Sequence, residues 1–276
     1  MQIKENNPEL WKSELYLPSK EDNKYSRGHV LINGGKIDSA GAVKLAASAA
    51  ARSLCGMVTV ACTKQTLPIY AHYFTSIMNK LVGTEQEFVQ FIKDRKVTSI
   101  LLGPGNGVDK YLKRLVIAVL KSKVPCVIDA DAISVFKNDN QELLNDLHKN
   151  CILTPHEGEF QRIFQFDGNR ENSIAQVAKL TDATIILKGN ETLVANKERI
   201  IINKNARPNL ATAGSGDVLA GIISGLLASG MEGFSAACAG VYIHGQCGNK
   251  IGLSAVADDI IEVLPKVFEE TNLQNL

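Results

Sequence analysis

The sequence has no excess of charge of either sign. Its 30 Lys and Arg residues nearly balance its 29 Asp and Glu residues, so the formal net charge at pH 7 is +1. A protein that binds nucleic acid or an anionic membrane through its overall charge is therefore not expected. Hydrophobic residues make up 45% and charged residues 21% of the 276 positions. This composition is that of a folded globular protein and excludes a largely disordered chain.

Long uninterrupted apolar runs are also absent. The most apolar segment, residues 218–231, is broken by Gly221, Ser224, Gly225 and Gly230. It is shorter than the ~20 residues that a membrane-spanning helix needs. The first residues, MQIKENNPEL, contain no apolar core of a signal peptide and do not have the composition of a transit peptide. We therefore expect a cytoplasmic protein that does not enter a membrane.

Cysteine pairs at metal-binding or redox spacing are missing as well. The sequence has six cysteines, none of them in a C-x-x-C pair, and most lie within apolar segments such as VPCVID and NCILT. This pattern favours buried free thiols in a reducing compartment over a disulfide framework or a zinc site. The cysteines are Cys55, Cys62, Cys126, Cys151, Cys238 and Cys247.

Short apolar segments do alternate with helical patterns along the chain. Continuous runs of Val, Ile and Leu are typical of parallel strands that are covered by helices on both faces. The expected strands are 29–34, 57–62, 98–103, 125–130 and 151–155, and the expected helices between and after them include 39–53 and 108–122. This alternation predicts a doubly wound α/β fold in one domain, because no linker or repeat divides the chain.

The pattern changes after residue 183. TIILKG, TLVAN and RIIIN read as three short strands separated by turn residues, which predicts an antiparallel patch at one edge of a mostly parallel sheet. The rest of the chain is expected to be helical, over 214–229, about 233–249 and about 257–270.

Small and polar residues gather where the expected strands end. Ligands of open α/β sheets bind beyond the carboxyl ends of the strands, so these clusters are candidate site residues. They read GGKIDSAGA (34–42), GPGNG (103–107), DADA (129–132), TPHEGE (154–159), LKGNET (187–192) and TAGSGD (212–217).

The GSGD segment carries the sharpest chemical signal. Gly214, Ser215 and Gly216 precede an apolar helix, where backbone N–H groups and the helix dipole form an anion-binding nest. Asp217 would lie in the first helical turn beside that anion. A carboxylate there suits a base that accepts a hydroxyl proton during phosphoryl transfer, although an Asp can also serve only to stabilise a helix start.

Other templates do not fit. The sequence contains no Walker A loop, no G-x-G-x-x-G dinucleotide fingerprint and no G-x-S-x-G nucleophile elbow. His156-Glu157 lacks the second His of a zinc helix. Dehydrogenases of the Rossmann type, serine hydrolases and zinc peptidases are therefore not expected.

Taken in order, seven segments resemble the motifs of the ADP/ATP-dependent NAD(P)H-hydrate dehydratases, the carbohydrate-kinase-like domain of the nicotinamide nucleotide repair system. They are NKYSRGHVLINGG, SAGAVKLAASAAARSLCGMVTVA, GPGNG, VIDADAI, ILTPHEGEF, LKGNETLVA and NLATAGSGDVLAGIISGLLASG. The resemblance covers about residues 23–265 and implies a ribokinase-like fold. It also implies a domain over 23–276, preceded by an N-terminal extension over 1–22.

The resemblance implies a repair reaction. A nucleotide, with ADP favoured over ATP, phosphorylates the ring hydroxyl of the S epimer of NADH hydrate or NADPH hydrate. Phosphate then leaves and NAD(P)H is restored. Asp217 matches the family's base, and the matching contacts with the hydrate are Gly41, Ala42, Gly105, His156 and Asp217. The matching nucleotide contacts are Lys188, Gly189, Asn190, Glu191, Thr192, Gly214, Ser215 and Gly216.

Some expectations stay open at this stage. His156 alone could equally be a helix-start residue, and Lys188 alone could be an exposed lysine after a strand. Mg²⁺ is implied by phosphoryl transfer, but Asp129 and Asp131 are more typical of residues that cap the following turn.

Partners and alternatives are open as well. The family implies a homotetramer and an epimerase for the R epimer, either on a separate chain or on a missing half. The alternatives are a kinase of a small alcohol, such as a vitamin precursor or sugar, and a nucleotide-binding regulator without turnover.

Overall fold

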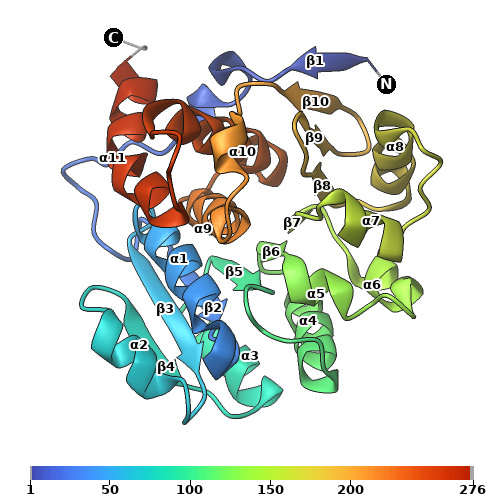
Figure 1. Ribbon diagram of the computed structural model, residues 1–276. Coiled ribbons are helices and arrows are strands. Elements are labelled where there is room, and N and C mark those ends of the chain that lie inside the picture. Colours follow the sequence, from blue (N-terminus) through green and yellow to red (C-terminus); the bar gives the residue numbers. More distant parts are fainter. Residues whose placement is uncertain (1, 274–276) are drawn as a thin grey trace.

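A computed structural model describes residues 2–273, and a single ten-stranded sheet runs through them (Figure 1). The strand order across the sheet is β1-β10-β9-β8-β7-β6-β5-β2-β3-β4. The strands are β1 (Ile3–Glu5), β2 (His29–Asn33), β3 (Met57–Cys62), β4 (Met78–Leu81), β5 (Ser99–Leu102), β6 (Cys126–Ile128), β7 (Cys151–Leu153), β8 (Thr184–Leu187), β9 (Thr192–Ala195) and β10 (Ile200–Asn203).

Neighbouring strands are parallel except around β9, which runs antiparallel to both β8 and β10. The predicted antiparallel patch is confirmed, and β1 adds one parallel strand beyond it. The two outermost strands, β1 and β4, are not predicted by the sequence patterns, because each is short and partly exposed.

Helices cover both faces of the sheet. Alternate strand residues point to opposite faces, so Val30 and Ile32 join one core cluster while Leu31 joins the other. The first cluster packs under α1, α2 and α9–α11, and the second packs under α3–α8 (Figure 1). The helices are α1 (Ala40–Ala51), α2 (Leu67–Tyr73), α3 (Glu85–Asp94), α4 (Lys110–Ser122), α5 (Ala130–Ser134), α6 (Asn140–Asp146), α7 (Glu157–Ile163), α8 (Arg170–Leu180), α9 (Ser215–Ala228), α10 (Gly233–Lys250) and α11 (Ala257–Leu273).

Helix α9 is the central helix of the first face, and 12 of its 14 residues are buried. Its glycines allow close packing against α1: a Cβ at Gly221 would lie 2.2 Å from the Ala46 carbonyl oxygen, and one at Gly225 would lie 2.5 Å from Ser53 Cβ. The apolar run over 218–231 is therefore a core helix. Among the described residues, no helix is both long and apolar enough to cross a bilayer.

The N-terminal segment packs on α10. Trp11 is fully buried and its ring centroid lies 5.6 Å from that of Tyr242. The Trp11 indole N–H donates to Asn6 Oδ1 at 3.2 Å, and Asn6 Nδ2 donates to the Cys238 carbonyl oxygen at 2.8 Å and to Asn203 Oδ1 at 2.9 Å. A buried polar side chain that is bonded in this way fixes the segment to the domain.

The six cysteines are buried free thiols, as the sequence predicts.

Candidate active site

The N-terminus of α9 is built to receive an anion. Gly214, its N-cap residue, has a φ of 86°, and a Cβ there would lie 2.3 Å from Leu45 Cδ1. The positive φ therefore favours glycine, and a larger residue would also displace the Leu45 side chain. Within the described residues no side chain caps this helix. The Ser215 N–H donates to the Thr212 carbonyl oxygen at 3.3 Å, so the N–H groups that follow it in the first turn, together with the positive end of the helix dipole, are available to a ligand.

Asp217 lies in the first turn of α9, and its carboxyl group is a much weaker acid than an ordinary aspartate. Burial raises the pKa of Asp217 to about 7, and the carboxylate of Asp129 acts in the same direction. The Lys188 ammonium opposes this shift, and Asp131 adds to it. A carboxyl group with a pKa near neutrality matches the demands of general-base catalysis.

Lys188 follows β8 and forms an ion pair with Asp129, which follows β6. Lys188 Nζ lies 2.9 Å from Asp129 Oδ1, and Thr154 Oγ1 donates to the same oxygen at 2.6 Å. Burial disfavours the ammonium charge, but Asp129 and Glu159 outweigh it and raise the pKa of Lys188. Lys188 is therefore a held cation rather than an exposed lysine.

The expected capping role of Asp129 is wrong. Asp129 is the N-cap residue of α5, but its side chain makes no capping bond and instead meets Lys188 and Thr154. Asp131 Oδ2 accepts the Gly107 N–H at 2.7 Å, so this carboxylate fixes the GPGNG loop rather than its own turn. Tertiary partners outcompete the local capping geometry for both carboxylates.

Arg170, at the start of α8, binds the backbone of the KGNET turn. Its guanidinium donates to the carbonyl oxygens of Leu187 at 3.1 Å, Lys188 at 3.2 Å and Glu191 at 2.9 Å. A Cβ at Gly189 would lie 2.5 Å from the same guanidinium. This clamp sets the direction in which the Lys188 side chain and the turn backbone point.

The turn and the start of α9 share one cavity of about 650 Å³. We name it the Lys188 cavity. It brings together seven predicted site residues, namely His156, Lys188, Gly189, Asn190, Thr192, Ser215 and Gly216. Its remaining lining residues are apolar ones, including Leu210, Leu219 and Val241, and polar ones, including Arg207 and Thr212. A cavity with apolar walls, a lysine and the start of a helix has the features of a nucleotide pocket.

Three residues of the KGNET and GSGD segments are not among the lining residues of this cavity, namely Glu191, Gly214 and Asp217. Glu191 is exposed, is not among the residues lining the Lys188 cavity, and its carboxylate lies 4.0 Å from Lys204 Nζ. Gly214 faces Leu45 and Ala257 and shapes the entry into α9.

The sequence leaves open whether His156 starts a helix or faces the site. His156 is the N-cap residue of α7, where its Nδ1 accepts the Glu159 N–H at 3.3 Å and its own N–H donates to Glu159 Oε2 at 2.9 Å. It also lines the Lys188 cavity. His156 thus starts a helix and faces the candidate site at the same time.

Gly105 lies beside the start of α1. It has a φ of 59°, and a Cβ there would lie 2.4 Å from the Ser39 carbonyl oxygen. Gly41 and Ala42 follow Ser39 within the first turn of α1. The structure therefore brings Gly105 close to the Gly41 and Ala42 segment, although none of the three is among the lining residues of the Lys188 cavity.

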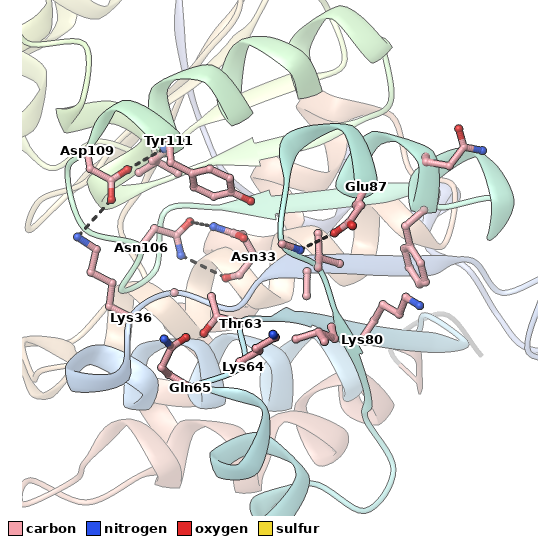
Figure 2. Close-up of a pocket in the computed structure, with 18 of the residues that line it drawn as sticks. Asn33, Lys36, Thr63, Lys64, Gln65, Lys80, Glu87, Asn106, Asp109 and Tyr111 are labelled. Atoms are coloured by element: carbon pink, nitrogen blue, oxygen red, sulfur yellow. Dashed lines mark hydrogen bonds and ion pairs between the residues drawn. The ribbon is translucent and has the colours of Figure 1, made fainter.

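A second cavity of about 930 Å³ opens beyond the GPGNG loop, between α3 and the carboxyl ends of β2, β3 and β4. We name it the Lys36 cavity. Asn33 Nδ2 donates to Asn106 Oδ1 at 2.9 Å, and Lys36 Nζ lies 3.3 Å from Asp109 Oδ2; both interactions are drawn in Figure 2. Lys64 and Lys80 also line it, as do the acidic residues Glu87 and Asp94. The cavity opens at the carboxyl ends of the strands, as the site of Asp217 does.

Three residues of the site are not predicted from the sequence. His244 lines the Lys188 cavity, and Asp129 and Arg170 bind residues of the KGNET turn. Asp129 was visible as a strand-end acid but not as the partner of Lys188, and Arg170 gave no local signal. His244 lies on α10, where its Nε2 is 3.0 Å from Ser215 Oγ. Burial lowers the pKa of His244 to about 4, with Lys188 acting in the same direction, so the ring is neutral at pH 7. Its place in the middle of an apolar helix was the only hint.

The fold has known counterparts. A ribokinase-like superfamily protein from Enterococcus faecalis superposes with a TM-score of 0.83 at 24% identity, covering 98% of this chain and 96% of that one. This likeness concerns the fold alone: the present protein has a ribokinase-like α/β fold, as the motifs imply.

The family follows from closer matches. A family model described as NAD(P)H-hydrate dehydratase matches residues 30–266. The ADP-dependent (S)-NAD(P)H-hydrate dehydratase of Neisseria meningitidis is 33% identical over 246 residues, which are 86% of this chain and 81% of that protein. An ADP/ATP-dependent NAD(P)H-hydrate dehydratase from Bacillus subtilis, co-crystallised with ATP and Mg²⁺, has a TM-score of 0.77 at 25% identity and covers 98% of this chain and 99% of that one. The chain belongs to the NAD(P)H-hydrate dehydratase family.

Some relatives are longer. The bifunctional NAD(P)H-hydrate repair enzyme of Moorella thermoacetica is 33% identical across 91% of this chain, but the match spans 52% of that enzyme. The chain thus spans about half the length of such bifunctional relatives.

Proposed function

We propose that this protein catalyses nucleotide-dependent dehydration of the S epimer of NADH hydrate or NADPH hydrate, with ADP as the favoured phosphoryl donor and ATP as the alternative. The observation that carries the proposal is the meeting of three features at one place. Asp217 has a pKa of about 7, Lys188 is a half-buried cation paired with Asp129, and the uncapped N-terminus of α9 adjoins the Lys188 cavity.

The chemistry needs each feature. Asp217 accepts the proton of the ring hydroxyl while that oxygen forms a bond to the terminal phosphorus of ADP and the bond from phosphorus to AMP breaks. The ring nitrogen lone pair then expels phosphate from C6, and transfer of the C5 proton to solvent restores the dihydropyridine. The sum is hydrate plus ADP giving NAD(P)H, AMP and phosphate, in which the hydroxyl oxygen leaves in phosphate.

Charge stabilisation would come from groups already in place. The segment Gly214, Ser215 and Gly216 at the start of α9 would lie against the transferred phosphoryl group, and Lys188 would balance the phosphate charge. Because Lys188 is held by Asp129, it needs no reorganisation when the nucleotide arrives. We assign Gly189, Asn190, Glu191 and Thr192 to the same nucleotide site, with Glu191 contributing through its backbone, because its side chain points away from the cavity.

The hydrate would lie along the carboxyl edge of the sheet. We propose that its nicotinamide ring lies between Asp217 and His156. Because Gly105, Gly41 and Ala42 have small side chains or none, the dinucleotide could lie close to the protein backbone there. The rest of the dinucleotide would extend past the GPGNG loop into the Lys36 cavity. That cavity has the volume of a ligand pocket and carries amino groups for the phosphates.

Mg²⁺ fits the site as a companion of the nucleotide. Mg²⁺ is commonly held by substrate phosphates and one or two carboxylates. Asp131 is near enough to raise the pKa of Asp217, and only its Oδ2 is engaged, by the Gly107 N–H. Asp131 would therefore be the carboxylate that holds the ion, which would supply charge neutralisation at the phosphates.

Further assignments rest on this proposal. An epimerase acting on the R epimer would be supplied by another chain or by a fused half, because relatives described as bifunctional are about twice as long. The six free thiols favour the reducing cytoplasm as the location. A homotetramer and a single catalytic domain over 23–276 complete the proposal; β4 exposes Met78 and Leu81 at a sheet edge where a second copy could pack.

The test is direct. Purified NADH hydrate is incubated with the protein, Mg²⁺ and either ADP or ATP, and the return of dihydropyridine absorbance is followed together with AMP and phosphate. We expect one AMP and one phosphate for each NADH with ADP. Protein that binds nucleotide but restores no NADH with either donor would overturn the proposal. Stable phosphorylation of a small alcohol instead would identify a kinase.

A further inference from the structure

A cluster of two thiols and one imidazole lies at the amino ends of β6 and β7. Asp217 is near the opposite, carboxyl ends of these strands. Cys126 and Cys151 are register partners on these adjacent strands, and their Sγ atoms are 3.6 Å apart. One ligand atom each of Cys126, His148 and Cys151 can be chosen so that all three lie within 4.8 Å of one another. Among the described residues this is the one such group of three.

Local backbone geometry explains why these side chains converge. The Cys151 N–H donates to the His148 carbonyl oxygen at 2.8 Å, which closes a tight turn just before β7. The turn brings two side chains that are three residues apart to the same side, as in the chelating turns of many zinc sites. The Cys126 N–H bonds the Asn150 carbonyl oxygen at 3.0 Å and fixes the third ligand against this turn.

The cluster is incomplete as a hydrogen-bonded group. His148 Nε2 is buried and has no hydrogen-bond partner within the described residues. Both thiols are fully buried. A buried polar nitrogen without a partner costs about 1–3 kcal/mol, and this one lies beside two soft ligands.

We propose that Cys126, His148 and Cys151 form a binding site for a thiophilic d¹⁰ metal ion, for which Zn²⁺ is the probe. Two sulfur ligands at about 2.3 Å from a tetrahedral ion lie ~3.8 Å apart, close to the 3.6 Å between the two Sγ atoms. Zn²⁺ replaces the two thiol protons, so the ion and two thiolates are together neutral, as an apolar interior requires. Two protons are released for each ion bound.

Binding through Nε2 requires one small rearrangement. His148 Nδ1 accepts the Asn150 N–H at 3.3 Å, and when Nε2 binds the ion the ring proton moves to Nδ1. That long hydrogen bond is then given up. The ion has an entry path, because His148 is only partly buried and lies in the loop between α6 and β7, next to exposed Lys149.

The role that follows is structural. The ion would join β6 to β7, the two strands whose opposite ends carry Asp129 and Thr154. It is too far along these strands to touch a substrate at Asp217, so binding is measurable without reference to turnover. The inference therefore does not depend on the proposed reaction.

The test uses the full chain, reduced and freed of metal by a chelator. Zn²⁺ affinity is measured by competition with a chromophoric chelator, and Co²⁺ reports thiolate ligation through a charge-transfer band in the near ultraviolet. We expect one equivalent of Zn²⁺, two protons released, and a higher Tm with Zn²⁺. Cys126→Ala, Cys151→Ala and His148→Ala should each weaken binding by more than ~100-fold, because even outer partners of ligands contribute about 10–100-fold.

A matched control separates this site from general thiol binding. Cys62 is an equally buried strand cysteine outside the cluster, so Cys62→Ala should leave Zn²⁺ affinity and the Co²⁺ spectrum unchanged. His148→Ala is at a partly exposed position and keeps the test open if a core cysteine variant does not fold. No stoichiometric Zn²⁺ uptake by the reduced protein, or a Co²⁺ spectrum unaffected by Cys126→Ala and His148→Ala, would overturn the proposal. A Cys126–Cys151 disulfide in air together with no uptake after reduction would do the same.

Discussion

The proposed reaction depends on Asp217, whose carboxylate would act as the base. Its position in an uncapped first turn, and its pKa of about 7, distinguish it from an acid that only stabilises a helix. Asp217→Asn keeps the shape and removes the basic oxygen, so kcat should fall by about 10²–10⁴-fold. Nucleotide affinity, measured by calorimetry, should change little. Turnover within about threefold of wild type would remove the base role.

The pH profile supplies a second readout for the same residue. The base works only when it is deprotonated, so wild-type turnover should fall as pH drops below about 7. Any residual turnover of Asp217→Asn should lack this acidic limb. A wild-type profile that is flat from pH 5 to 8 would contradict the assignment.

Folding stability should also depend on the protonation of Asp217, but it should be higher at low pH, where turnover is lower. The folded protein holds the Asp217 proton more tightly than the unfolded chain, whose pKa is near 3.8. The resulting stabilisation is complete below about pH 4 and is lost as pH rises through about 7. Urea unfolding at pH 5 and pH 8 should therefore show a smaller pH-dependent loss for Asp217→Asn than for wild type. Equal losses in both proteins would mean that the carboxyl group is not buried in solution.

Lys188 must be tested together with its partner. Lys188→Met removes the cation and should weaken nucleotide binding by ~1–3 kcal/mol. Alone it also leaves Asp129 as an unpaired buried charge, which costs about 3–5 kcal/mol of stability. The double variant Lys188→Met with Asp129→Asn should regain most of that stability but not the nucleotide affinity. Recovery of both would show that Lys188 serves only to hold Asp129.

An exposed lysine provides the control for that cycle. Lys197 pairs with Asp182, and both side chains are more than half exposed, at 58% and 60%. Lys197→Met should change stability and nucleotide affinity by less than about 0.5 kcal/mol.

These residues also show where sequence reasoning stops. The GSGD and KGNET segments could be chosen because glycine and charge patterns are local. The bond between Lys188 and Asp129 joins positions that are 59 residues apart, and the clamp by Arg170 reaches the turn from another helix. No local pattern encodes such pairs, because they arise only when parallel strands bring their carboxyl ends together.

At the scale of the element, the start of α9 offers a matched pair of glycines. Gly214→Ala forces a side chain into a positive φ and against Leu45, so the free energy of unfolding should fall by ~1–3 kcal/mol. Gly216 has helical backbone, and a Cβ there would lie 3.6 Å from Lys188 Nζ, an ordinary contact. Gly216→Ala should therefore keep or raise stability while weakening nucleotide binding. Equal loss of stability in both would contradict this division, as would unchanged nucleotide affinity in Gly216→Ala.

The elements themselves were predictable in proportion to their burial. Strands buried on both faces, such as β2 and β5, are continuous apolar runs and are predicted correctly. The outer strands β1, with sequence IKE, and β4, with sequence MNKL, mix polar and charged residues because solvent reaches them. Their pairing is decided by the neighbour strand, which no short-range pattern reveals.

At the scale of the whole molecule, the N-terminal segment contributes to the core although it lies outside the family match at residues 30–266. Trp11 is fully buried, so Trp11→Ala should lower the free energy of unfolding by about 3–5 kcal/mol. Leu17 in the same segment is 62% exposed, and Leu17→Ala should stay within about 0.5 kcal/mol of wild type. Denaturant unfolding measures both; similar small losses would mean that the segment is not docked in solution.

The packing of Trp11 on α10 has an optical consequence. The sequence contains one tryptophan, so all indole emission from this protein originates at the seam between the N-terminal segment and α10. A red shift would report water entering that seam, whereas far-ultraviolet circular dichroism would report the sheet and its helices. If the emission changes at lower denaturant than the dichroism, the N-terminal segment leaves first, and the protein signals that partial opening without any attached label.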